Sequence, residues 1–156
     1  MKNFVLTLAC ISFLVIVGAA IYEHLTMVPK WSAAPPLSLA MFQGKFGLNS
    51  GLFWMPVHPV TLVLMITALA LNWKTPRRLP ILGVLSVYIV VLLITSVYFV
   101  PELLAIINTP FSSMVDAGLQ TRASRWEIWS IVRLFVLLPA GFILLSSLTK
   151  PANKAL

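Results

Sequence analysis

Four apolar blocks alternate with polar segments along the chain, at residues 4–22, 56–72, 79–100 and 128–149. Each block is close to the roughly 20 residues that an α-helix needs to cross a hydrocarbon core of about 30 Å. Hydrophobic residues make up 60% of the chain and charged residues only 10%, which argues against an ordinary soluble domain. The pattern therefore predicts an all-α fold, an integral membrane antiparallel four-helix bundle that forms one domain over residues 1–156.

The connections between the blocks differ in length. Residues 23–55 and 101–127 form two long loops, whereas residues 73–78 form a short one. Long connections without a function are uncommon, so we expect specialised structure on the side of the long loops. The first long loop is rich in Pro, Gly and aromatic residues and predicts an ordered cap over the bundle mouth. In the second, Ser112 or Ser113 is the expected N-cap of a helix that runs into the fourth span.

The distribution of charge predicts the orientation. Six basic residues and no acidic residue lie on the side of the short loop: Lys2, Lys74, Arg77, Arg78, Lys150 and Lys154. Cytoplasmic loops hold an excess of Lys and Arg, so we expect both termini in the cytoplasm and the spans in the inner membrane of a bacterium. Membrane topology then accounts for most of the formal charge of +7, and nothing in the pattern predicts nucleic-acid binding. The expected partners are membrane lipids and a lipophilic small molecule.

The candidate chemistry lies on the opposite, outer side, which holds all the acidic residues and histidines: Glu23, His24, His58, Glu102, Asp116 and Glu127. His24, His58 and Glu102 form a set of two imidazoles and one carboxylate, which suits iron or another transition metal. The same three residues suit acid–base catalysis, while substrate hydrogen bonding and a structural role stay open for the histidines. The expected cofactor is none, a transition metal, or haem at His24 or His58. Cys10 is the only cysteine, which excludes an internal disulfide and a thiolate cluster.

The start of the fourth helix carries a face of cations and indoles: Arg122, Arg125, Trp126, Trp129 and Arg133. At about 100° per residue these side chains share one sector of the helix. Arg133 lies inside the span, where a charge at the centre of a helix costs about 2.5–3.5 kcal/mol on insertion scales, so we expect a buried partner.

The third helix offers that partner on a face formed by Tyr88, Thr95, Tyr98 and Glu102. Glu102, or otherwise Glu23, is the carboxylate expected to contact Arg133. The contact is either an ion pair that fixes the helix register or part of a ligand pocket. In the second case the substrate-binding residues are Glu23, Tyr98, Arg122, Arg125, Trp126, Trp129 and Arg133.

Several stretches resemble the small four-span membrane proteins grouped with the fungal anthrone oxygenases. The residues that carry the resemblance are 22–25 (YEHL), 53–59 (FWMPVHP), 72–74 (NWK), 98–102 (YFVPE) and 122–133, within an overall match of about residues 15–145. The resemblance implies oxygen-dependent oxidation of an activated, aromatic or quinone-like carbon. The four-span glutathione transferases of membranes are less similar, because their charged site faces the cytoplasm, where this chain has no acidic residue.

Two functions follow as hypotheses. The first is a membrane-embedded oxidoreductase or oxygenase whose site opens to the outer face, with His24 or His58 as base and Arg125 or Arg133 stabilising negative oxygen. The alternative is a non-catalytic membrane module that binds a lipid, quinone, haem or partner subunit.

Overall fold

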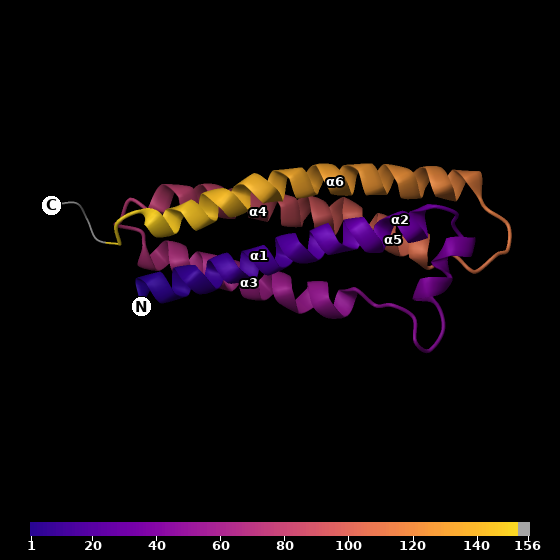
Figure 1. Cartoon of the computed structure of the whole chain (residues 1–156), viewed down its shortest axis with the longest axis horizontal. Coiled ribbons are helices and arrows are strands. Elements are labelled where there is room, and N and C mark those ends of the chain that lie inside the picture. The colour runs from indigo at the N-terminus through magenta and orange to yellow at the C-terminus, as the bar shows by residue number, and fades with distance from the viewer. Residues whose placement is uncertain (153–156) are drawn as a thin grey trace.

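The computed structural model describes residues 1–152 as a bundle of long helices. Four helical stretches are long and apolar enough to cross a membrane: Lys2–Ser32, Gly51–Leu71, Arg78–Ile107 and Ala117–Thr149. They run antiparallel, and the start of α1 and the end of α6 lie at the same end of the bundle, opposite α2 and α5 (Figure 1). The predicted all-α membrane bundle is therefore confirmed.

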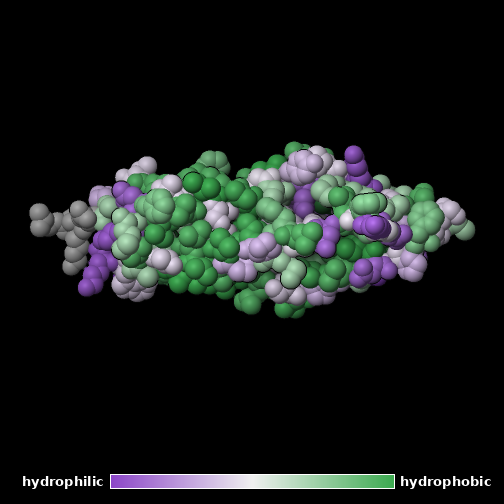
Figure 2. Space-filling view, turned by 90° about the horizontal axis from the view of Figure 1, so that it is seen from below, coloured by the Kyte–Doolittle hydropathy of each residue, from purple (hydrophilic) through white to green (hydrophobic). Residues whose placement is uncertain are grey.

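The bundle contacts are made mainly by α1 (Lys2–Thr26), which packs on α3 (Gly51–Leu71) and α6 (Ala117–Ser146). α4 (Arg78–Ile94) closes the bundle against α3 and α6. Only 17–33% of the residues in each apolar span are buried inside the protein. The remaining apolar surface forms a wide belt around the bundle, with hydrophilic residues gathered mostly toward its ends (Figure 2). An apolar belt of this size is suited to contact with lipid, because contact between so much apolar surface and water would be unfavourable.

Small residues let α1 and α6 approach closely in the interior. Gly141 of α6 faces Phe13 of α1, and a Cβ added to Gly141 would lie 3.6 Å from the Phe13 ring. Phe13 is fully buried and makes an edge-to-face contact with Tyr88 of α4, with ring centroids 5.4 Å apart. Lipid is as apolar as the core, so this packing stabilises the bundle chiefly through van der Waals contact.

The third span is not a regular α-helix. A π-helical turn at Thr95–Phe99 joins α4 to α5 (Val100–Ile107). Pro101 has no backbone N–H to donate, and the Val100 N–H bonds to the Thr95 carbonyl, so the hydrogen-bond ladder slips by one residue here.

The first long loop is an ordered cap, built from α2 (Val28–Ser32) and a 3₁₀ helix at Leu37–Phe42. Trp31 is 2% exposed and packs edge-to-face on Trp126 of α6, with centroids 5.3 Å apart. The Ser32 hydroxyl donates a 2.6 Å hydrogen bond to Glu127, also on α6. The cap thus forms a second hydrophobic core with the adjacent ends of the third and fourth spans.

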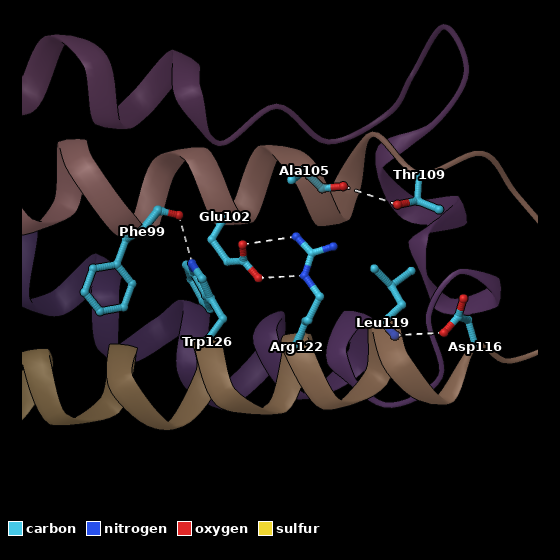
Figure 3. A network of polar contacts seen from close by, with 8 residues as sticks. All are labelled: Phe99, Glu102, Ala105, Thr109, Asp116, Leu119, Arg122 and Trp126. Atoms are coloured by element: carbon cyan, nitrogen blue, oxygen red, sulfur yellow. Dashed lines mark hydrogen bonds and ion pairs between the residues drawn. The ribbon is translucent and has the colours of Figure 1, made fainter.

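The N-cap expected at Ser112 or Ser113 is wrong. α6 begins at Ala117, and the Asp116 carboxylate accepts a 2.9 Å hydrogen bond from the Leu119 N–H (Figure 3). Asp at this position satisfies one of the free N–H groups of the first turn. Helix α6 therefore begins eleven residues before the predicted apolar block. This early start affects which residues of α6 lie opposite those of the third span.

One of the six basic residues on the side of the short loop is not on the surface. Arg77 is 4% exposed and donates to the Asn3 side chain at 2.7 Å and to the Lys150 and Leu148 carbonyls at 2.8 and 3.2 Å. Its guanidinium thus joins the start of α1, the short loop and the end of the fourth span. Lys154 lies outside the described residues.

Candidate functional site

Five polar or aromatic side chains from four helices lie between the middle of the bundle and the cap, in what we call the outer half: Glu23 (α1), Trp54 and His58 (α3), Tyr88 (α4) and Arg133 (α6). We refer to them as the outer polar cluster. The packing of α1, α3, α4 and α6 brings these residues together although they are distant in sequence.

His58 is held on two sides. Its Nδ1 is 2.8 Å from the Tyr88 hydroxyl, and its ring stacks on the Trp54 indole with centroids 5.3 Å apart and planes at 19°. Trp54 precedes His58 by one helical turn, so both side chains lie on the same face of α3. No hydrogen bond engages His58 Nε2 within residues 1–152, and this atom is not among the buried atoms that lack a partner. Nε2 is therefore not sealed inside the bundle.

Glu23 is fixed by Trp54. The Trp54 indole N–H donates to Glu23 Oε1 at 2.9 Å. Glu23 also lines an open groove of about 290 Å³ between the outer end of α1 and the start of α3. The lining is mostly apolar: Ala19, Tyr22, Glu23, Met27, Leu48, Asn49, Ser50 and Phe53. The groove therefore offers one carboxylate at the edge of an apolar surface.

Arg133 is paired with neutral groups. Its Nη1 donates to Thr95 at 3.0 Å, its Nη2 donates to Ser130 at 2.9 Å, and its guanidinium lies 4.3 Å from the Phe99 ring centroid. Within residues 1–152 no carboxylate reaches it at ion-pair distance. Glu23 and His58 lie near enough for its charge to act on them through space, with no hydrogen bond or ion pair joining them to it in residues 1–152. Arg133 is therefore a partly buried cation without a direct counterion in this part of the chain.

The predicted contact between Arg133 and Glu102 is wrong. Glu102 accepts two hydrogen bonds from Arg122, at 2.8 and 3.0 Å (Figure 3). One turn further in, the Trp126 indole N–H donates to the Phe99 carbonyl at 2.9 Å.

The error is one of register. Glu102 follows Thr95 by two helical turns, and Thr95 is the residue that lies level with Arg133. α5 carries Glu102 two turns beyond Thr95 toward the cap, and the early start of α6 places Arg122 opposite it. The Arg122 and Glu102 side chains are 40% and 20% exposed, so their ion pair lies at the surface of the bundle and not in its core.

The predicted cationic face of α6 is divided in the structure. Trp126 is 5% exposed and belongs to the core, whereas Trp129 is 53% exposed and Arg125 is also exposed. Tyr98 is half-buried and packs edge-to-face on Phe99. The buried stripe of α6 runs through Trp126 and Ser130, so residues on its far side point outward. Of the substrate-binding residues expected, only Glu23 and Arg133 lie in the outer polar cluster.

His24 does not join His58 and Glu102 at a metal site. Its Nδ1 is 2.7 Å from the Ala20 carbonyl, and its Nε2 is buried without a hydrogen-bond partner. In the part of the chain that the structure describes, no three His, Cys, Asp or Glu side chains lie together so that they could hold a metal ion. The expected three-residue set fails because Glu102 is engaged with Arg122.

Sequence reasoning missed Trp54 and Ser130 and did not connect Tyr88 with His58. The one-turn spacing of Trp54 and His58 is a local signal for their stacking. The Tyr88 contact depends on how α3 and α4 pack, which no local spacing indicates.

Searches against protein-family models, curated proteins and solved structures find no match to this chain.

Proposed function

We propose that this is a membrane-embedded oxidoreductase that acts on a lipophilic aromatic or quinone-like molecule at the outer polar cluster. The observation that supports it most is Arg133, a cation inside the bundle that contacts two hydroxyls and a ring face but no carboxylate within residues 1–152. Such a cation stabilises negative charge on a ligand oxygen more strongly than it would in water. His58, with an accessible Nε2, lies within its electrostatic range.

The chemistry that suits this pair begins with proton removal. His58 Nε2 takes a proton from an acidic C–H beside an aromatic ring, and Arg133 stabilises the charge that moves onto the conjugated oxygen. The carbanion adds to molecular oxygen and recovers a proton, which gives a hydroperoxide. Loss of water then leaves a new C=O, so one oxygen atom ends in the product and the other in water.

The test is oxygen uptake by the purified protein in nanodiscs, with anthrone as the probe. We expect one O₂ consumed per anthrone, with anthraquinone as product. Loss of the base in His58→Asn, or of the cation in Arg133→Gln, lowers the rate by about 100-fold, the effect typical of a general base or an oxyanion donor. Arg78→Gln, an exposed arginine at the other end of the bundle, keeps the wild-type rate. A rate equal to that of empty nanodiscs, or equal in all variants, contradicts the proposal.

One observation favours a second function, a non-catalytic module that binds a lipid or quinone. The groove beside Glu23 is lined by neither His58 nor Arg133, so a ligand can dock there away from both. This alternative predicts that a lipophilic molecule is retained through purification and detected by mass spectrometry, that Glu23→Gln lowers its amount, and that anthrone is not consumed.

A further inference from the structure

Glu23 has a free carboxylate oxygen beside the groove between α1 and α3. Its Oε1 accepts the hydrogen bond from the Trp54 indole at 2.9 Å, while no hydrogen bond engages its Oε2 within residues 1–152. Oε2 is also not among the buried atoms that lack a partner, so it is not sealed inside the bundle. In the same residues no cation lies at ion-pair distance from Glu23. The groove therefore carries a negative charge that no protein cation contacts directly.

The groove also offers hydrogen-bond donors, because Asn49 and Ser50 line it together with Glu23. Asn49 Oδ1 accepts from the Gly51 N–H at 3.1 Å, which leaves the amide nitrogen of Asn49 without a partner in residues 1–152. The Ser50 hydroxyl makes no hydrogen bond to the start of α3. One groove thus combines an anionic acceptor with two neutral donors.

The groove lies where two apolar blocks of the sequence end. Glu23 directly follows the block 4–22, and Phe53 shortly precedes the block 56–72. Lipid headgroups meet a membrane protein where its apolar spans end. From the groove, the apolar surface of α1 continues toward the middle of the bundle, since Val15 lies one helical turn from Ala19 and is 44% exposed.

We infer that the groove binds an aminophospholipid, a lipid whose headgroup carries a primary ammonium and a phosphate diester, as phosphatidylethanolamine does. The ammonium donates to Glu23 Oε2, the phosphate accepts from Asn49 and Ser50, and an acyl chain lies along the exposed apolar face of α1.

Charge complementarity selects this headgroup among common ones. The trimethylammonium of phosphatidylcholine has no N–H to donate to Oε2, and phosphatidylglycerol brings an anion without a cation to a carboxylate. His58 and Arg133 do not line the groove. The inference therefore names the ligand class for the lipid-binding alternative and rests on that function, not on the oxidation chemistry.

The test is native mass spectrometry of the full chain released from nanodiscs that hold equal amounts of dioleoyl phosphatidylethanolamine, phosphatidylcholine and phosphatidylglycerol. We expect the ethanolamine lipid to be retained about 10-fold more than either of the others, the effect of one charge-assisted hydrogen bond. Equal retention, or a preference for another headgroup, overturns the inference. This comparison uses the wild-type chain and needs no variant to fold.

Glu23→Gln tests the carboxylate, because Gln keeps an acceptor for the Trp54 indole but carries no charge. We expect the preference for the ethanolamine lipid to be lost. The matched control is Glu127→Gln, which makes the same change of charge at a residue that accepts from Ser32 and does not line the groove. The control should keep the preference. A preference that survives in Glu23→Gln, or falls equally in both variants, overturns the inference.

Dodecylamine separates a phospholipid site from a site for any amphiphilic cation, because it has an ammonium and an apolar chain but no phosphate. We expect about 10-fold more dodecylamine than ethanolamine lipid to be needed for equal occupancy, because it makes no bond to Asn49 or Ser50. Equal potency overturns the assignment to a phospholipid. Anthrone turnover without a lipid preference contradicts this inference alone, and a lipid preference without turnover supports it while contradicting the oxidation chemistry.

Discussion

The Trp54 indole holds two functional groups at once: its N–H donates to Glu23 at 2.9 Å, and its ring stacks on His58. Trp54→Phe keeps an aromatic ring but removes the donor. A hydrogen bond to a charged group contributes about 1.5–3 kcal/mol, so we expect unfolding in mixed micelles to become easier by an amount in that range. Trp73→Phe is the control, because Trp73 is 50% exposed and its ring, which faces the Arg78 guanidinium at 5.2 Å, is kept by the substitution. Equal losses in the two variants would show that the Glu23 bond contributes nothing.

The ion pair of Glu102 and Arg122 can be separated from Arg133 by a double-mutant cycle. The pair is bidentate but partly exposed, so we expect a coupling energy of about 1 kcal/mol between Glu102→Gln and Arg122→Gln. It should weaken at high salt, because exposed charges are screened. Glu102→Gln and Arg133→Gln should be additive, since the two residues share no contact. A larger coupling of Glu102 to Arg133 than to Arg122 would contradict the register of the third and fourth spans.

That register marks the limit of what the sequence could predict. Hydropathy and length alone identify the four spans, because a membrane constrains both. Hydropathy does not indicate which residues of two neighbouring helices lie opposite each other, since this depends on helical residues outside the apolar blocks. α5 extends to Ile107 and α6 begins at Ala117, and together they place Glu102 opposite Arg122. Thr95 did lie on the face predicted to meet Arg133, so the helix face was correct while the depth was not.

The outer polar cluster was predictable only in part, for a related reason. His58 and Arg133 stand out in the sequence as polar residues within or beside apolar blocks. Tyr88 does not, because a tyrosine in a span is equally suited to the core. Its link to His58 arises only when α3 and α4 pack together.

Arg77 and Arg78 are adjacent in sequence and differ in environment, which makes them a matched pair. Arg77→Gln removes bonds to the Asn3 side chain and to the Lys150 and Leu148 carbonyls. Breaking a buried charged network costs about 3 kcal/mol, and we expect a loss of that order in the free energy of unfolding. Arg78→Gln, at an exposed position, should change it by less than about 0.5 kcal/mol. Similar losses in both variants would mean that the three bonds do not hold the inner end together.

Gly141 tests how closely α1 and α6 pack. A Cβ at this position meets the Phe13 ring at an ordinary contact distance of 3.6 Å, so Gly141→Ala should be tolerated. Gly141→Leu overfills the interface, and we expect a destabilisation of about 1–3 kcal/mol, measured by denaturation in mixed micelles. Gly83 has nothing within 4 Å of its Cβ position, so Gly83→Leu is the control and should be neutral. If Gly141→Leu were equally neutral, the two helices would not be in contact at this level.

We propose that the end of the bundle holding Lys74 faces the cytoplasm and that the cap faces outward, because basic residues accumulate on cytoplasmic loops. Cysteine labelling tests this cleanly, since Cys10 is the only cysteine and is 2% exposed, so Cys10→Ser gives a background without reactive thiols. Lys45→Cys in the cap and Lys74→Cys in the short loop both replace exposed residues. A membrane-impermeant maleimide should label Lys45→Cys once the outer face of the membrane is accessible, and Lys74→Cys only after the membrane itself is permeabilised. The reverse pattern would place the outer polar cluster in the cytoplasmic half of the membrane, and labelling of both positions from one side would contradict the four-span bundle itself.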